Sequence, residues 1–333
     1  MVSASFPNTR LRRNRRYNWL RDLVAETSVS PKDLVWPLFI RDKGTSATVP
    51  SLPGVRRYLV EELQDAVSLA QEAGVTALML FPVVEQHLKD AKASQSLNPE
   101  GLVLNATRAL AHLAPNMGIM VDLALDPFTD HGHDGFYHEG DVLNDATVEH
   151  LCQVALLQAE AGAHMIAPSD MMDGRIGAIR KTLDGAGYNH VGILAYAAKY
   201  ASSLYGPFRD IVDSSGCLKG GSKATYQMDP RNGNEAMREV AQDIAQGADA
   251  VMVKPGSLYL DIVYRVKSTF QIPTFAYHVS GEYAMLKAAA AAGYLDEPAV
   301  LLETLTAFKR AGADAIITYS ALEAGHFLQE ALS

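Results

Sequence analysis

The amino-acid sequence predicts an α/β fold, a (β/α)8 barrel of the TIM type with an extended N-terminal arm. Two observations predict it: a short phrase repeated four times, and eight apolar runs that alternate with helical patterns. A chain of 333 residues with 48% hydrophobic and 20% charged residues has ample material for one large barrel. We expect the arm at residues 1–30 and the catalytic barrel at residues 31–333.

The repeated phrase is a helix that ends in Ala-Gly or Gln-Gly, followed by a short apolar strand. Glycine is expected directly after a helix because it adopts the left-handed conformation at no steric cost. The strands that follow these glycines, and four more runs, are largely continuous in apolar character, which suits a parallel sheet covered by helices. The eight expected strands are Leu34–Ile40, Val75–Phe81, Gly118–Leu125, Ala163–Ala167, Val191–Tyr196, Ala248–Val253, Pro273–His278 and Ala313–Tyr319.

Helical patterns fill most of the gaps between these runs. A doubly wound open sheet is the competing fold, but no Gly-x-Gly-x-x-Gly phrase follows the first strand. A barrel carries its active site at the C-terminal ends of its strands. Polar and titratable side chains gather at those ends: Arg41, Asp42, Asp122, Asp126, Ser169, Asp170, Tyr196, Lys199, Lys254, Tyr277, Ser280, Tyr319 and Ser320.

Two of these strand-end residues are lysines. Lys254 closes the run Ala250–Val253, and Lys199 comes three residues after the run that ends at Tyr196. Burial and a second nearby cation both lower the pKa of a lysine, which leaves a neutral amine able to attack a carbonyl. The pair therefore predicts an enzyme that forms Schiff bases. For either lysine alone, the alternative is a strand-end side chain that reaches solvent.

A long loop rich in glycine and serine lies between the fifth and sixth expected strands, at residues 205–227. Loops of this kind at the C-terminal face of a barrel are typical active-site lids. Its cations Arg209, Lys219 and Lys223 are candidates for binding a substrate carboxylate, and Arg209 offers a planar two-pronged contact. A solvated loop with incidental charges is the alternative, and the two lysines favour the lid.

The densest group of possible metal ligands follows the third strand: Asp122, Asp126, His131, His133 and Asp134. Such residues bind zinc or magnesium, and a His-x-His pair is typical of metal-dependent barrel hydrolases. Those hydrolases carry the pair at the end of the first strand, whereas here it lies beyond the third. We therefore favour carboxylates that orient ammonium groups and transfer protons over a metal site.

Composition narrows the setting of the protein. The net charge of −9 argues against general nucleic-acid binding by the body of the chain. Only two cysteines are present, Cys152 and Cys217, which fits a reducing, cytoplasmic setting. We find no signal peptide and no apolar run long enough to cross a bilayer, so no membrane contact is expected.

The first 30 residues have little apolar periodicity and carry six arginines: Arg10, Arg12, Arg13, Arg15, Arg16 and Arg21. A solvated tail, a nucleic-acid arm and an arm that wraps a neighbouring subunit are competing interpretations. Trp19 and Leu23 supply apolar anchors nearby, so we favour the subunit arm.

Seven segments together are similar to those of one known family: Ile166–Arg175, Tyr196–Ser202, Tyr205–Asp210, Lys223–Pro230, Met252–Gly256, Tyr259–Asp261 and Val279–Met285. The family that the chain resembles is porphobilinogen synthase, also called 5-aminolevulinate dehydratase. The resemblance spans almost the whole chain. It implies a (β/α)8 barrel whose arm embraces a partner subunit in a homo-oligomer, hexamer or octamer. It also implies the condensation of two 5-aminolevulinate molecules to porphobilinogen, with loss of two waters, in tetrapyrrole (haem and chlorophyll) biosynthesis.

The resemblance implies roles for single residues. Lys254 forms a Schiff base with the substrate that ends up bearing the propionate, and Lys199 holds the second substrate. Asp122, Asp126 and Asp134 surround the amine of the second substrate and assist proton transfer. The residues expected to bind substrate carboxylates are Arg209, Lys223 and Gln227 for the second substrate, and Ser280 and Tyr319, beside Tyr277, for the first.

One departure from the family concerns metals. Zinc-using members have three cysteines in the loop after the third strand, where this chain has Ala124, Asp126 and Asp134. Thiolates suit zinc and this set does not, so we predict no catalytic zinc and no cofactor required for the chemistry. Glu239 matches a position where some members bind a structural or allosteric magnesium. A glutamate on a helix surface is an equally good interpretation of Glu239.

Three other functions are rivals. A class I aldolase-type lyase would use one Schiff-base lysine, with the second lowering its pKa. A nucleic-acid-binding protein would use the arginine-rich arm. A metal-dependent hydrolase would use the aspartates and histidines after the third strand.

Overall fold

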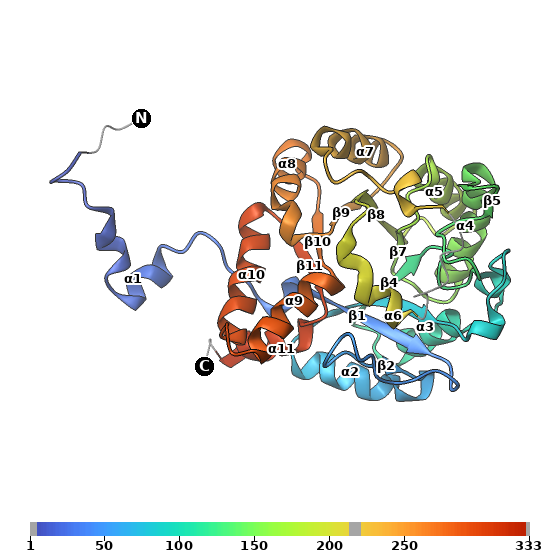
Figure 1. The fold of residues 1–333 in the computed structure, drawn as a ribbon, viewed down its shortest axis with the longest axis horizontal. Coiled ribbons are helices and arrows are strands. Elements are labelled where there is room, and N and C mark those ends of the chain that lie inside the picture. Colours follow the sequence, from blue (N-terminus) through green and yellow to red (C-terminus); the bar gives the residue numbers. More distant parts are fainter. Residues whose placement is uncertain (1–4, 213–220, 331–333) are drawn as a thin grey trace.

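The computed structural model describes residues 5–212 and 221–330, and it confirms the barrel (Figure 1). Eight parallel strands form one closed sheet, because β1 pairs with β3 on one side and with β11 on the other. Each expected apolar run overlaps one of these strands. They are β1 Leu34–Arg41, β3 Ala77–Val83, β4 Gly118–Leu123, β7 Met165–Pro168, β8 Gly192–Lys199, β9 Ala250–Lys254, β10 Thr274–His278 and β11 Ala315–Thr318.

Helices cover the outside of the barrel (Figure 1). They are α2 Leu63–Glu72, α3 Leu102–Leu113, α4 Asn144–Glu160, α5 Arg175–Gly185, α7 Gly233–Ala245, α8 Leu260–Phe270, α9 Ser280–Ala291, α10 Glu297–Ala311 and α11 Ala321–Glu330. The short helix α6 Gly206–Ile211 lies over the middle of the ring of strands instead (Figure 1). Three short strands lie outside the closed ring: β2 Arg57–Tyr58, which pairs with β1, and the hairpin of β5 Tyr137–His138 with β6 Asp141–Val142.

The glycines of the repeated phrase have the predicted conformation. Gly162 and Gly247 have φ values of 101° and 103°, in the left-handed region that a side chain would strain. Each lets the chain turn from a helix directly into the following strand, so the phrase is the connection from helix to strand in the barrel.

The strands separate two apolar layers. Side chains such as Ile119 and Val251 face outward into a layer shared with the helices. Phe39, Phe81 and Met252 face the inside of the barrel, where the rings of Phe39 and Phe81 stack with centroids 5.2 Å apart. The interior is therefore filled by side chains, and space for a ligand is left only toward the ends of the strands.

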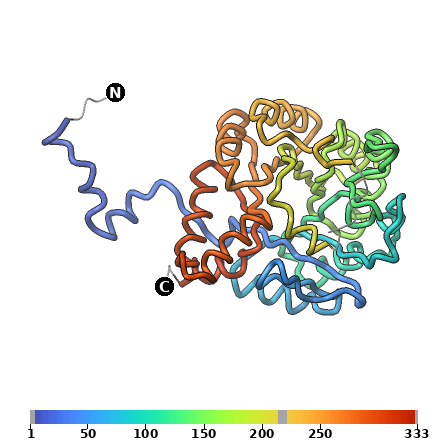
Figure 2. The backbone as a smooth tube through the Cα atoms, viewed as in Figure 1, coloured from blue at the N-terminus to red at the C-terminus, as the bar shows by residue number. Residues whose placement is uncertain are grey.

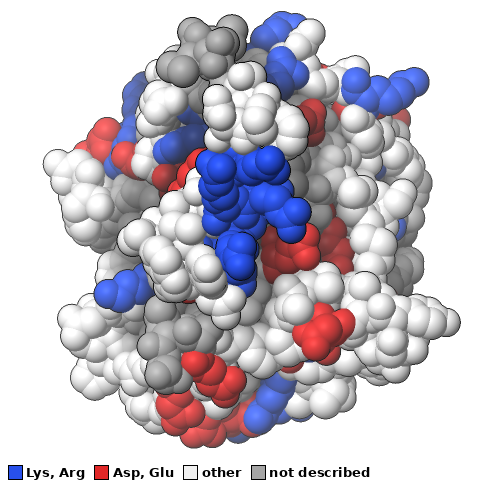
Figure 3. Space-filling view, turned by 90° about the vertical axis from the view of Figure 1, so that its left-hand side faces the viewer, with Lys and Arg blue, Asp and Glu red and all other residues white. Residues whose placement is uncertain are grey.

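The arm extends away from the barrel (Figures 1 and 2) and contains α1 Asn18–Leu23. Trp19 and Leu23 are 63% and 75% exposed, and the six arginines are exposed as well. Figure 3, which views the molecule from the side of the arm, shows Lys and Arg side chains gathered near the centre of that face. Over the described residues, no helix has both the length and the apolar character that a bilayer crossing requires.

Candidate active site

The two lysines lie side by side at the C-terminal ends of neighbouring strands. Lys199 is the last residue of β8 and is the direct partner of Lys254, the last residue of β9. The prediction that the strand stops at Tyr196 was wrong, because β8 continues for three more residues. The C-terminal position of both residues agrees with the active-site face of a barrel.

A β-bulge explains both the extra length and the direction of Lys199. Between Ala195 and Ala198, β8 advances three residues while β9 advances only two, from Val251 to Val253. In a regular strand, successive side chains alternate between the two faces. At the bulge, two successive alanines join the outer apolar layer, and the residue that follows them, Lys199, lines the pocket.

A buried arginine holds this bulge. Arg175 Nη2 donates to the carbonyl of Tyr196 at 3.2 Å, inside the irregular part of β8. Its guanidinium also pairs with Asp170 at 3.6 Å and with Asp243 at 3.4 Å. Burial raises the pKa of Asp170 to about 6, although Arg175 opposes this shift. Arg175 had no predicted role, because nothing in its local sequence pattern indicates a partner on another strand.

Aromatic rings surround the amine of Lys254. Its Nζ lies 4.4 Å from the ring centroid of Tyr277, 5.0 Å from that of Phe208, 5.1 Å from that of Tyr196 and 5.4 Å from that of Tyr205. The residue is only 5% exposed. Burial, followed by repulsion from Lys199, lowers the pKa of Lys254 to about 7. A substantial fraction of this amine is therefore neutral at physiological pH and able to act as a nucleophile.

Lys199 has polar surroundings instead. Its Nζ lies 3.1 Å from a carboxylate oxygen of Asp134 and donates a short hydrogen bond to the carbonyl of Ser169. The two neighbouring lysines thus differ in environment, one among rings and one in an ion pair.

Asp122 lies at the end of β4 and is buried. Burial raises its pKa to about 7, and the nearby ammonium groups of Lys254 and Lys199 limit the shift. Ser169 Oγ donates to its carboxylate at 3.2 Å. A carboxyl group with a pKa close to neutral both accepts and donates protons readily, as general acid and base catalysis requires.

The other two predicted aspartates bind lysines. Lys223 contacts Asp126 at 3.3 Å and donates a short hydrogen bond to Asp134, and Gln227 Nε2 donates to Asp134 at 3.4 Å. Burial alone would raise the pKa of Asp134, but Lys199 and Lys223 lower it to about 2. Asp134 therefore stays ionised and fixes both lysines in place.

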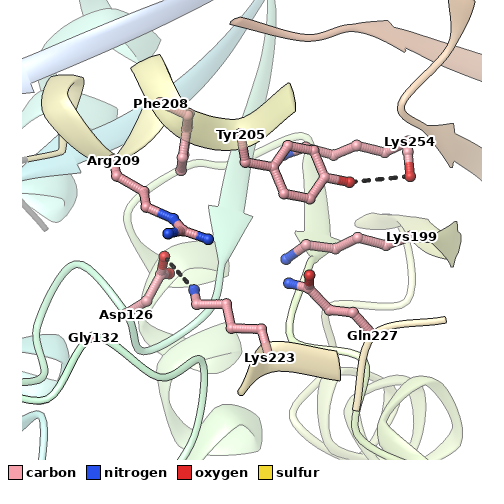
Figure 4. Close-up of a pocket in the computed structure, with 9 residues that line it drawn as sticks. All are labelled: Asp126, Gly132, Lys199, Tyr205, Phe208, Arg209, Lys223, Gln227 and Lys254. Atoms are coloured by element: carbon pink, nitrogen blue, oxygen red, sulfur yellow. Dashed lines mark hydrogen bonds and ion pairs between the residues drawn. The ribbon is translucent and has the colours of Figure 1, made fainter. Parts of the chain in front are cut away.

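Five of these side chains, those of Asp126, Lys199, Lys223, Gln227 and Lys254, line one pocket together with Tyr205, Phe208 and Arg209 (Figure 4). Figure 4 shows Lys199, Lys223 and Gln227 pointing into it across from Arg209 and Phe208 of α6. The structure thus brings Arg209, Lys223 and Gln227 together, as the sequence analysis predicted. Residues 213–220 of the predicted lid, including Lys219, lie outside the described residues.

Three hydroxyl-bearing residues gather on the Lys254 side. Ser280, at the start of α9, is buried, and its Oγ accepts a hydrogen bond from Phe208 N at 3.0 Å. The rings of Tyr277 and Tyr319 are 6.2 Å apart, and burial raises the pKa of each phenol. Both phenols therefore stay protonated and able to donate to an anion.

The candidate metal ligands among the described residues do not form a metal-binding group. His133 stacks on Tyr137 with ring centroids 4.5 Å apart, and His131 Nδ1 accepts from the backbone N–H of His133. Glu239 is half-buried on α7, and burial followed by Asp243 raises its pKa. Among the described residues, no group of three His, Cys, Asp or Glu side chains is arranged to hold a metal ion.

A second missed residue, Glu282, connects two parts of the site. Its carboxylate accepts from the backbone N–H of Ser257 and of Val279, each at 2.8 Å. Ser257 follows Lys254 by three residues, and Val279 precedes Ser280. One buried side chain therefore ties the end of β9 to the start of α9, on either side of the space beside Lys254.

The fold and the pocket define the class of protein: a (β/α)8 barrel enzyme whose site combines two buried lysines with acidic side chains. A family profile described as Delta-aminolevulinic acid dehydratase matches residues 8–327. The chain belongs to this family, whose members are lyases of the hydro-lyase type.

Individual relatives agree over nearly full length. The delta-aminolevulinic acid dehydratase of Bradyrhizobium diazoefficiens is 51% identical over 96% of this chain and 91% of its own. That of Rhodobacter capsulatus is 48% identical over 96% and 97%. The crystal structure of the Toxoplasma gondii enzyme, in complex with the reaction product porphobilinogen, is 49% identical and superposes with a TM-score of 0.94 over 97% of this chain and 92% of its own.

Proposed function

We propose that this chain condenses two molecules of 5-aminolevulinate to porphobilinogen, releasing two waters, through Schiff bases on Lys254 and Lys199. The observation that carries the proposal is the direct pairing of these two lysines across β8 and β9 in one pocket. Each Schiff base releases one water, and the two bonds formed between the substrates release both lysines. The enzyme and its two substrates would otherwise have to meet in solution. Holding both ketones in one pocket makes the bond-forming steps effectively unimolecular.

Lys254 is suited to attack the first ketone. At pH 7, an amine with a pKa of about 7 is roughly half neutral, about a thousandfold more than a lysine with the ordinary value. The iminium that results is more electrophilic than the ketone, and its neighbouring carbon is more acidic. Ser280 and Tyr319, with Tyr277, supply hydroxyl groups for the carboxylate of this first substrate.

The second substrate fits the polar half of the pocket. We assign its carboxylate to Arg209, Lys223 and Gln227, and its Schiff base to Lys199. The ion pairs of Lys223 with Asp126 and Asp134 then exchange for contacts with the ligand, and these carboxylates receive the substrate amine. Asp122, with a pKa of about 7, moves protons between the substrates.

Metal ions are not needed for these steps. The resemblance places the thiolates of zinc-using family members at Ala124, Asp126 and Asp134 of this chain. The carboxylates of Asp126 and Asp134 both contact Lys223. That donor set does not fit zinc, so we propose a zinc-independent enzyme. Glu239 lines a different pocket together with Asp173 and Glu235. A magnesium ion bound at Glu239, outside the active site, stays a prediction.

We further propose that the arm binds a neighbouring subunit and so builds a homo-oligomer, either hexamer or octamer. The exposed Trp19 and Leu23 supply apolar contacts that a solvated tail or a nucleic-acid arm does not need. A cytoplasmic setting follows from the use of only two cysteines in 333 residues.

Trapping with borohydride tests the proposal. Labelled 5-aminolevulinate reduced on the enzyme should be found on Lys254, with a second adduct on Lys199, by peptide mass spectrometry. A sugar phosphate should give no adduct, which separates this enzyme from an aldolase. A pyrrole-forming assay with and without a chelator should give the same rate. Neither adduct nor pyrrole from 5-aminolevulinate would refute the proposed function.

A further inference from the structure

The short helix α6 forms the wall of the pocket above Lys254. Phe208 in this helix lies 5.0 Å from the Lys254 amine, and Arg209 lines the same pocket (Figure 4). Six residues make less than two turns, so the helix has little stability of its own. Its position must therefore be set by contacts with the rest of the protein.

Two buried cations bind the C-terminal end of α6. Arg57 donates from Nε to the carbonyl of Ile211 at 2.8 Å and from Nη2 to that of Asp210 at 2.6 Å. Lys89 Nζ donates to the carbonyl of Val212 at 3.2 Å. The last carbonyl groups of a helix have no partner within it and carry partial negative charge, so cations stabilise them.

Both cations come from parts of the chain that are distant from α6 in sequence. Arg57 lies in β2, which pairs with β1, and its Nη1 also donates to the carbonyl of Ser46 at 3.1 Å. Lys89 follows β3. Arg57 is 3% and Lys89 7% exposed, and a cation is rarely buried to that extent unless it is bound by acceptors.

We infer that Arg57 and Lys89 are positioning residues: they fix the C-terminal end of α6 and thereby hold Phe208 and Arg209 over the amine of Lys254. The inference rests on the reaction proposed above, since it gives two residues outside the pocket a part in that reaction. Neither cation lines the pocket, and both donate to carbonyl groups at the C-terminal end of α6 or directly after it.

Displacement of α6 should change the protonation of Lys254. Burial is the largest cause of its lowered pKa, and Phe208 supplies part of that burial. The other groups that face it are cationic, acidic and phenolic, and they come from other elements: Lys199, Asp122, Asp126, Asp134, Tyr196, Tyr205 and Tyr277. Displacing α6 leaves most of these groups in place but admits water, so the pKa of Lys254 should rise.

Arg57→Met and Lys89→Met test the inference in the full-length protein. The direct measurement is the pH dependence of Lys254 acetylation by acetic anhydride, followed by peptide mass spectrometry without substrate. The midpoint should move up by about one pH unit in each variant, which means about tenfold less neutral amine at pH 7. In the pyrrole assay, KM should rise severalfold through Arg209, and the kcat lost at pH 7 should partly return at higher pH.

Arg56→Met and Lys92→Met are matched controls, because both side chains are exposed neighbours that do not bind α6. They should leave the midpoint and the kinetics unchanged. Arg57→Lys keeps the positive charge but cannot donate to two carbonyl groups in the same geometry. The midpoint should therefore move up less in Arg57→Lys than in Arg57→Met. Should Arg57→Met fail to fold, judged by circular dichroism, Lys89→Met and Arg57→Lys carry the test.

An unchanged Lys254 midpoint in a folded Arg57 or Lys89 variant overturns the inference. The same holds if the control variants shift the midpoint as much. Failure of the proposed function looks different: the unmodified protein then makes no pyrrole and no borohydride adduct. The acetylation midpoint is measured without substrate and still reports whether α6 is held by these two cations.

Discussion

Replacing Lys254 with methionine is expected to stabilise the folded protein while it abolishes turnover. The ordinary pKa of a lysine is 10.5, and burial together with Lys199 lowers that of Lys254 to about 7. At about 1.4 kcal/mol per pH unit, this difference corresponds to about 5 kcal/mol, the cost of keeping the charge in the fold. Water that enters the pocket reduces the cost, so the figure is an upper bound. Methionine has a similar length and suits the surrounding rings.

The sign of the pH dependence follows from proton counts. Between about pH 7 and 10.5, the unfolded chain keeps the proton on Lys254 and the folded protein does not. The free energy of unfolding of the unmodified protein therefore rises with pH in this window. The advantage of Lys254→Met is largest at and below pH 7, shrinks through the window and vanishes above pH 10.5.

Denaturant unfolding at about pH 6.5, 8 and 9.5, at one fixed protein concentration, measures this advantage. Lys199→Met is the matched control and should behave in the opposite way. It removes a partner from the buried Asp134 and is expected to destabilise the fold by about 3 kcal/mol. If Lys254→Met destabilises the protein at pH 6.5, or if its advantage does not change with pH, the reasoning about the buried amine is wrong.

Further substitutions separate the roles of the pocket residues. Asp122→Asn should lower kcat about 100-fold with a smaller effect on KM, as steady-state kinetics will show. Arg209→Ala should raise KM for 5-aminolevulinate about tenfold while borohydride still traps substrate on Lys254; unchanged kinetics would remove Arg209 from the carboxylate site. Deletion of residues 1–23 should give a smaller assembly in light scattering, whereas loss of nucleic-acid affinity without a change in size would favour the nucleic-acid arm.

The barrel could be predicted because its strands and connections follow local rules. A strand covered on both sides must be apolar along its length, so each buried strand appears as a continuous run. Glycines such as Gly162 mark the helix ends because the left-handed conformation excludes most other residues. The place of Lys254 at the active-site end of its strand could be predicted for the same reason, since a charged residue ends an otherwise apolar strand.

The exact geometry of Lys199 could not be predicted, because a bulge has no signature in this sequence. The residues from Ala195 to Ala198 suit either face of a strand, and only the pairing with β9 shows that one residue is extra. Arg57 and Arg175 are similar cases. Arg57 donates to carbonyls more than 150 residues away along the chain, and a backbone carbonyl looks the same in every sequence.

The contrast between the two lysines supports a division of labour. They are the same residue type, paired across adjacent strands, yet Lys254 faces four rings and Lys199 faces a carboxylate and a carbonyl. Lys254 is therefore prepared for attack in the resting protein, helped by the charge on its neighbour. In the proposed reaction, the carboxylate of the second substrate competes with Asp134 for Lys223, and its amine competes with Lys199 for Asp134. We therefore expect binding of the second substrate to loosen the contact between Lys199 and Asp134, so that this amine is released only when its own substrate is present.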